Sequence, residues 1–175
     1  KPLRGILLVP WMIPITVTAL IFKLLFATDI GVLNYILKSL HLVSENIEWL
    51  TTPQTAMFAL ICANVWIGIP FNMILISTGL TTIPKDLYES ASIDGATGLQ
   101  AFFKITLPYM LYVTTPYLIT TFTGNVNNFN IIYLLSGGDP VTDLSSTAGS
   151  TDLLVTWLYK LTIDKQYYNI GAVIG

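Results

Sequence analysis

Two long uncharged stretches dominate this sequence of 175 residues. No Lys, Arg, Asp or Glu occurs from Thr55 to Pro84 or from Ile105 to Gly138. Uncharged apolar runs are typical of membrane-spanning helices, because about 20 residues at 1.5 Å each cross a hydrocarbon core of about 30 Å. Only 10% of the residues are charged, whereas soluble domains carry about 25%. The sequence therefore predicts an all-α, polytopic helical membrane protein.

The apolar runs place the expected membrane spans along the chain. Pro10 and Pro14 should bend the first of these helices, because proline removes a backbone donor and crowds the preceding turn. The chain ends within apolar residues, so we expect it to be one partial domain, residues 1–175, of a longer protein. The expected spans are residues 5–26, 55–80 and 107–135, with the start of another at 167–175.

The segment between the second and third spans, residues 84–108, is mixed and charged. Pro84 suits a first helical position, and Gly95 suits the end of that helix because glycine adopts positive φ readily. Thr97 can cap a second short helix, which Pro108 should close as it begins the next span. The pattern predicts two short helices joined at a glycine, which form a compact element rather than a flexible loop.

This segment resembles the EAA motif, EAA-xxx-G-x9-I-x-LP, of ATP-binding-cassette (ABC) importer permeases. The spacing fits throughout, with Ser90 in place of the usual second alanine. The resemblance implies that the segment faces the cytoplasm and couples the permease to an ATPase subunit. The residues that match the motif are Glu89, Ser90, Ala91, Gly95, Ile105, Leu107 and Pro108.

Nearly the whole chain is similar to the maltose/maltodextrin branch of these permeases, in particular to the C-terminal half of the larger, MalF-type subunit. Segments such as "NVWIGIPFNMILISTGL", "NNFNIIYLLSGGDP" and "AGSTDLLVTWLYKLT" carry this likeness. The likeness implies a partial type I importer transmembrane domain in a multi-pass protein of the cell membrane. The implied partners are a second permease subunit, an ABC ATPase dimer that binds ATP and Mg²⁺, an extracellular sugar-binding protein, an oligosaccharide and membrane lipid.

Polar residues near the outer end of the third span suggest where a solute would bind. Thr121, Gly124, Asn125 and Asn128 fall on one helical stripe, and asparagine offers donors and acceptors that suit sugar hydroxyl groups. A second stripe, Thr120, Thr123, Asn127 and Asn130, lies one position over, and periodicity alone does not choose between them. The alternatives without solute binding are a helix that leaves the membrane at this point and asparagines that bridge neighbouring helices.

The resemblance extends the candidate sugar site to the first and second spans. This sequence departs from the family pattern at Phe71, where the family often has a tyrosine with its hydroxyl group, and at Gly124, where the family can have an aromatic residue. These departures leave the particular sugar open. The implied site consists of Trp11, Ile67, Gly68, Phe71, Thr121, Gly124, Asn125 and Asn128.

Other functions find less support in these residues. The two long uncharged stretches contain no ionisable residue of the kind that an ion-coupled secondary transporter uses within the membrane. No GxxxxGK[ST] phosphate loop occurs, so ATP is expected to bind a separate subunit. We expect no catalytic or metal site, and the net charge of −2 gives no indication of nucleic-acid binding. The alternatives are a permease for another oligosaccharide or sugar derivative, and an ion-coupled transporter.

Overall fold

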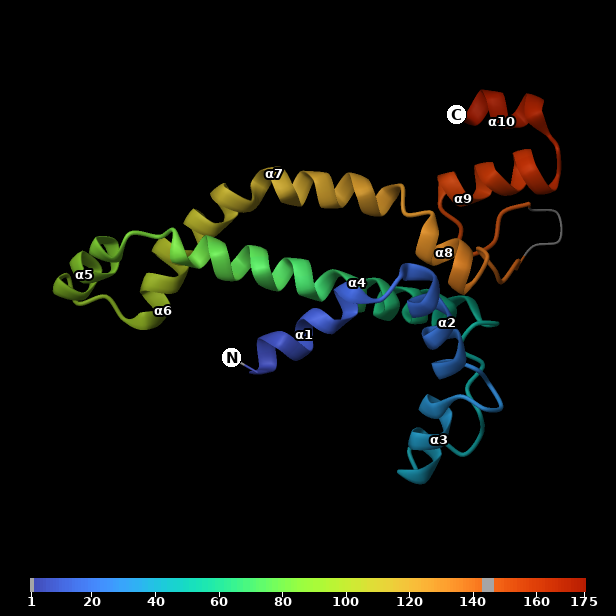
Figure 1. Cartoon of the computed structure of the whole chain (residues 1–175), viewed down its shortest axis with the longest axis horizontal. Coiled ribbons are helices and arrows are strands. Elements are labelled where there is room, and N and C mark those ends of the chain that lie inside the picture. Colours follow the sequence, from blue (N-terminus) through green and yellow to red (C-terminus); the bar gives the residue numbers. More distant parts are fainter. Residues whose placement is uncertain (1, 143–146) are drawn as a thin grey trace. The chain divides into compact units, whose positions relative to one another are not determined.

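The computed structural model describes residues 2–142 and 147–175, and within them it contains helices and connecting segments but no strand (Figure 1). The predicted all-α fold is therefore confirmed. The elements are α1 (Pro2–Met12), α2 (Ile15–Leu25), α3 (Val32–Ser39), α4 (Pro53–Thr81), α5 (Lys85–Ile93), α6 (Gly98–Ala101), η1 (a π-helix, Phe102–Thr106), α7 (Leu107–Val126), α8 (Asn130–Leu135), α9 (Leu154–Tyr159), η2 (a π-helix, Lys160–Asp164) and α10 (Tyr168–Ile174).

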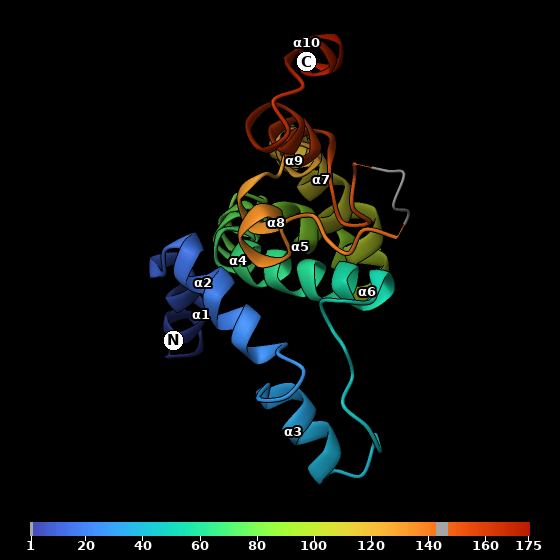
Figure 2. The ribbon, with the colours of Figure 1, turned by 90° about the vertical axis from the view of Figure 1, so that its right-hand side faces the viewer.

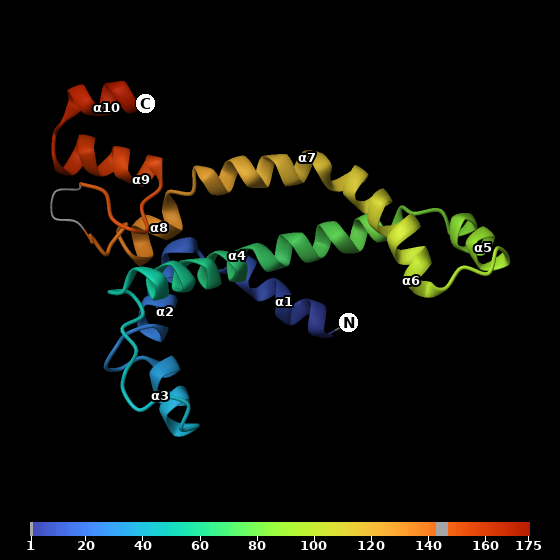
Figure 3. The same ribbon diagram turned by 180° about the vertical axis from the view of Figure 1, so that it is seen from behind.

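The chain divides into two compact units. Unit 1 consists of Lys1–Gly68 and Val126–Gly175, and unit 2 consists of Ile69–Asn125. The division falls within α4 and at the end of α7. In unit 2, α5 and α6 lie beyond the point where the end of α4 meets the start of α7, as Figures 1 and 3 both show.

The first apolar segment is not one helix. It breaks into α1 and α2, which are bent by 104° at residues 13 and 14. Pro14 has no N–H for the carbonyl group of Pro10, and it disfavours helical φ/ψ at Ile13. The N–H of Ile13 bonds to Pro10 O at 3.4 Å instead, and α2 starts with the bond from Thr18 N–H to Pro14 O. The predicted proline bend is confirmed, and the segment expected as a span over residues 5–26 consists of two helices.

The helix in the third apolar segment also ends earlier than the composition of that segment predicts. The helix expected over residues 107–135 stops at Val126, and the separate helix α8 follows after three residues. Asparagine side chains can compete for the backbone groups of a helix, and two asparagines follow Val126 directly. The side-chain amide of the second, Asn128, donates to Asn64 Oδ1 of α4.

Among the described residues, α4 is long and apolar enough to cross a membrane, and the bent pair of α1 and α2 makes a second crossing if it counts as one span. The most apolar window of α4 has a mean hydropathy of 2.0 and is only 22% buried. The helix continues through the buried Pro70 without interruption. The crossing of the membrane by α7 and by α10 stays a prediction.

The core of unit 1 is built where small residues let helices approach closely. Ala19 of α2 and Ala63 of α4 are almost fully buried and pack with Ile131 and Leu135 of α8. A second cluster gathers Phe26, Trp49 and Ala59. These contacts fix α2, α8 and the first half of α4 in one unit.

Asn34 organises the polar segment that joins α2 to α4. Its side chain is 2% exposed. The amide group donates to Thr28 O and Ile47 O, and the amide oxygen accepts from Ile47 N–H and from the indole N–H of Trp49, at 2.9–3.2 Å. All four hydrogen-bonding positions of the amide are therefore used. This explains how α3 and the segment returning from it to α4 (Figure 2) are held together.

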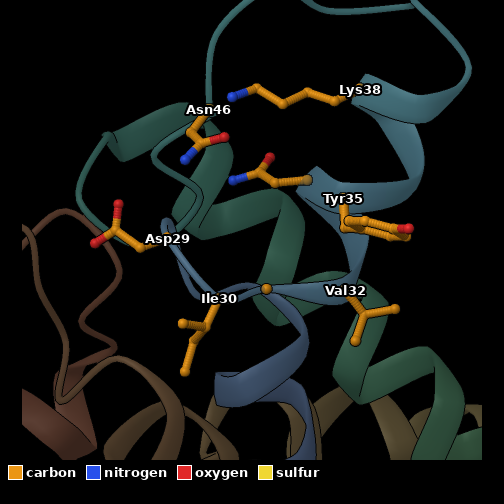
Figure 4. A pocket seen from close by; sticks show the side chains of 8 residues that line it. Asp29, Ile30, Val32, Tyr35, Lys38 and Asn46 are labelled. Carbon is orange, nitrogen blue, oxygen red and sulfur yellow. The ribbon is translucent and has the colours of Figure 1, made fainter.

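An open hollow of about 400 Å³ lies beside this amide in unit 1. Figure 4 shows Asp29, Tyr35, Lys38 and Asn46 around it. Because the hydrogen-bonding capacity of Asn34 is already satisfied, this side chain supports the segment rather than offering bonds to a ligand.

A hydrogen-bonded clasp connects residues 136–140 to residues 147–152 in unit 1. Thr151 is 1% exposed, and it donates its N–H to Gly138 O at 3.2 Å and its hydroxyl to Asp139 O at 2.7 Å. The clasp therefore holds two chain segments together through polar contacts on a buried residue.

Candidate functional site

The predicted coupling segment forms a defined element at the end of unit 2. Helix α5 ends in a Schellman motif, in which Ala96 N–H bonds to Ala91 O at 2.9 Å and Gly95 N–H bonds to Ser92 O at 3.1 Å. Gly95 has φ +75°, the left-handed conformation that glycine adopts without steric cost. The four-residue spacing from Ala91 to Gly95 thus places the two residues at the C3 and C′ positions of one helix end, as the motif spacing requires.

The second half of the element starts at a capping box. Thr97 Oγ1 accepts from Gln100 N–H, and the Gln100 side chain accepts from Thr97 N–H. The predicted cap at Thr97 is confirmed. Pro84, predicted as the first helical residue, is instead the N-cap of α5, one residue earlier.

Pro108 does not close the second short helix. Helices α6, η1 and α7 follow one another without a break, and Pro108 is the second residue of α7. Proline cannot donate to the carbonyl group of Lys104 four residues before it. The helix accommodates this with the wider π turn, in which Leu107 N–H bonds to Phe102 O. Pro108 therefore lies directly after the π turn, in the first turn of α7.

The motif residues have two different environments. Glu89, Ser90, Gly95 and Pro108 are exposed, whereas Ala91, Ile105 and Leu107 are half-buried. None of the residues of α5 is buried. An open hollow of about 410 Å³ separates α5 from the helix that follows it, and its lining includes Ala91, Gly95, Ala96, Gln100, Lys104 and Ile105. The helix α5 is therefore not packed into a core of unit 2.

Large apolar side chains project from the same element. Ile93 is 87% exposed, Leu99 is 73% exposed and Phe103 is 62% exposed. Exposed apolar side chains gathered on one short element are typical of a surface that contacts another protein or a membrane.

The candidate sugar residues are divided between the two units. In unit 1, the Asn128 amide donates to Asn64 Oδ1 at 2.9 Å, and Ile67 packs against the main core cluster. Gly68 is half-buried in α4 and Trp11 is 63% exposed in α1. The structure therefore joins Asn128 to a residue of α4 that shares a helical face with Gly68.

In unit 2, the candidate residues lie on α4 and α7. The ring of Phe71 packs on Tyr117 with centroids 5.1 Å apart. The Asn125 amide donates to Thr121 O at 2.8 Å, within its own helix. In the part of the chain that the structure describes, no atom beyond the chain neighbours and local helix backbone of Gly124 lies within 4 Å of a Cβ placed on it. The Gly124 position therefore borders open space, as a close approach by a ring requires.

Tyr117 was missed by reasoning from the sequence. A signal existed, because Tyr117 precedes Thr121 by four residues and extends the same helical stripe. In the competing stripe, the hydroxyl groups of Thr120 and Thr123 bond to carbonyl groups of their own helix. Threonine hydroxyl groups commonly do so in helices, so which stripe faces a solute path stays a prediction.

Residues 1–163 match the family described as binding-protein-dependent transport system inner membrane component. The chain belongs to this family. Its membrane setting is therefore that of an inner-membrane component of such transport systems.

Several curated relatives of this family member are sugar permeases. The chain is 44% identical to the galactooligosaccharides transport system permease protein GanP of Bacillus subtilis (strain 168) over 172 residues, which is 98% of the chain and 40% of GanP. It is 40% identical to the maltodextrin permease protein MdxF of the same organism. It is 42% identical to the maltose/maltodextrin permease protein MalF of Escherichia coli (strain K12), covering 98% of the chain and 34% of MalF. The chain thus spans well under half the length of these relatives.

Solved structures share the fold. The chain superposes with a TM-score of 0.74, at 23% identity, on a bacterial ABC transporter involved in the import of the acidic polysaccharide alginate. The match covers 100% of the chain and 58% of the solved one. A second structure, of an alginate transporter in complex with an alginate pentasaccharide-bound periplasmic protein, gives a TM-score of 0.73. The fold is therefore that of ABC importer permeases.

Proposed function

We propose that this chain is part of the membrane-spanning permease subunit of a binding-protein-dependent ABC importer for neutral oligosaccharides. The observation that carries the proposal is the element formed by α5, Gly95 and α6. It combines a rigid Schellman turn with exposed motif residues and exposed apolar side chains. Membership of the family and relatives named as sugar permeases support it.

The proposed mechanism assigns ATP and Mg²⁺ to a separate ATPase dimer. ATP binding closes that dimer and displaces the coupling element, and alternating access follows in the spans. Such coupling requires that the ATPase contact α5 differently in its two states. A second permease subunit completes the path. An extracellular sugar-binding protein delivers the solute to the connecting segments of residues 27–53 and 136–166.

The proposed solute is an uncharged oligosaccharide, with maltodextrin as the first candidate. The candidate residues carry amide, hydroxyl, aromatic or aliphatic side chains or are glycines, and none is charged. Asparagine suits sugar hydroxyl groups, and an aromatic face such as that of Phe71 suits the apolar face of a sugar ring. A charged polymer such as alginate would instead favour basic partners. Galactooligosaccharides form a second candidate because of the 44% identity to GanP.

Uptake by the reconstituted complex tests the proposal. Labelled maltotriose should enter proteoliposomes only with ATP and the binding protein. Unlabelled maltose, longer maltodextrins and galactooligosaccharides are then added as competitors to rank the sugars. Uptake that persists when ATP hydrolysis is blocked and ion gradients are maintained would favour the ion-coupled alternative and contradict the proposal.

A further inference from the structure

Helix α5 is attached to the rest of unit 2 at few points. It has no buried residue, and an open hollow lined by Ala91, Lys104 and Ile105 lies between its C-terminal part and η1. Its two ends are joined covalently, through Pro84 to the end of α4 and through Gly95 to α6. Held at its ends alone, a short helix can swivel about the line joining them when another protein pushes on its exposed face.

One side-chain contact opposes this motion. The hydroxyl groups of Tyr88 and Thr106 lie 2.7 Å apart, within hydrogen-bonding distance, with either group as donor. Among residues 2–142 and 147–175, no other hydrogen bond links a side chain of α5 to another element. Tyr88 is half-buried in the middle of α5. It thus provides a third attachment point away from the two ends.

The partner of Tyr88 occupies a position from which motion can pass onward. Thr106 is the last residue of the π-helix η1, and α7 begins at the next residue. α7 is a single helix that carries Thr121 and Asn125 near its other end. π turns inside α-helices are rare and are frequently found at functional sites. The Tyr88–Thr106 contact therefore meets the chain at the start of the helix that leads to candidate solute residues.

We propose that the hydrogen bond between Tyr88 and Thr106 transmits displacement of α5 to α7, which makes Tyr88 a positioning residue for coupling. This inference rests on the proposed function. Without the bond, α5 still docks on its ATPase partner but swivels about its ends, so ATP is hydrolysed with less sugar moved.

The test compares four variants of the full permease in its assembled complex in proteoliposomes. Tyr88→Phe and Thr106→Val each remove one hydroxyl group of the bond, and their combination removes both. Thr106→Ser keeps the hydroxyl group. The readout is the number of ATP molecules hydrolysed per sugar imported, since a general loss of folding or assembly lowers both activities together and leaves this ratio unchanged.

Loss of one such hydrogen bond should raise ATP consumption per sugar about three- to tenfold in Tyr88→Phe and in Thr106→Val. The double variant should match either single variant, because both lose the same bond, and Thr106→Ser should stay close to the wild type. Tyr112→Phe is the matched control, since Tyr112 is 82% exposed on α7, and it should keep the wild-type ratio.

An unchanged ratio in Tyr88→Phe overturns the inference, as does a double variant whose defect is the product of the two single defects. Failure of the proposed function is distinct, because the wild-type complex would then show no ATP-driven sugar uptake. Amide hydrogen exchange of Gly95 and Ala96 supplies a readout without transport. It should be faster in Tyr88→Phe than in Tyr112→Phe, and equal exchange rates count against the inference.

Discussion

Replacing Lys160 by Met removes the positive charge that pairs with Asp152. The two groups are 2.8 Å apart, and their side chains are 16% and 2% exposed, respectively. After the change, Asp152 Oδ2 keeps the N–H of Gly149, at 2.8 Å, as its one remaining partner among residues 2–142 and 147–175. Within the same residues, its buried Oδ1 already has no hydrogen-bond partner. Removing one partner from a buried ion pair costs about 3–5 kcal/mol, so the clasp that contains Asp152 should open far more often.

Amide hydrogen exchange measures this opening directly. The N–H groups of Ser150 and Thr151 bond across the clasp to Pro140 O and Gly138 O, and they exchange when it opens. For local opening, a loss of about 3–5 kcal/mol corresponds to exchange about a hundredfold to several thousandfold faster in Lys160→Met. Met is chosen as the replacement because its unbranched side chain is similar in length to that of lysine but carries no charge.

Two further variants sharpen the result. Lys165→Met is the matched control, because Lys165 is exposed, and its exchange should equal that of the wild type. Adding Asp152→Asn to Lys160→Met removes the unpaired charge and should restore part of the protection. Wild-type exchange in Lys160→Met would refute the reasoning, and so would a double variant less protected than Lys160→Met alone.

Three other substitutions test the remaining structural arguments. Gly95→Ala should destabilise the α5 turn by about 1–2 kcal/mol, because φ at this residue is +75°, although there is space for a Cβ. Gly95→Asn should cost less, and equal hydrogen exchange of the Ala96 amide in the two variants would contradict this reasoning. Asn34→Leu should lower the stability of the complex by about 2–4 kcal/mol, because the partners of one buried and three part-buried hydrogen bonds are left unpaired, and an unchanged thermal midpoint would contradict this. Asn128→Ala should raise the KM for sugar uptake more than Asn127→Ala does, and the reverse order would favour the competing stripe.

Local chemistry made the coupling element predictable. The positive φ of Gly95 and the cap at Thr97 depend on residues within one helical turn, and both predictions are confirmed. The π-helix before Pro108 was not predicted. Composition gives no signal for it, because it results from a proline within a continuous helix rather than from the residues of the π turn themselves.

Contacts between distant residues were beyond the reach of pattern reasoning. Asn34 lies in a polar segment that suggests a solvated surface, yet it is 2% exposed and bonds to Trp49, 15 residues later. Tyr88 and Thr106 are 18 residues apart. Neither periodicity nor spacing indicates such pairs, because they depend on how helices fold back on one another.

The ends of the apolar segments were also only partly predictable. Hydropathy is averaged over many residues and does not show where a helix ends, so the sequence predicts a single span over residues 107–135. In the structure α7 ends at Val126, directly before Asn127 and Asn128, residues that disfavour a helix interior. For the sugar site, the stripe on α7 was visible in the sequence, whereas the ring contact between Phe71 and Tyr117 needed the structure.

The corner between α1 and α2 constrains how the bilayer can surround this part of the chain. Each helix has 11 residues, so at 1.5 Å per residue each reaches about 16 Å, roughly half of the hydrocarbon thickness. Because the two helix axes are bent by 104°, the pair reaches only about 20 Å from end to end, which is less than the hydrocarbon thickness of about 30 Å. Helix ends carry backbone donors and acceptors that lipid tails cannot satisfy. Wherever this corner lies within the bilayer, its helix ends must therefore face water or other protein segments.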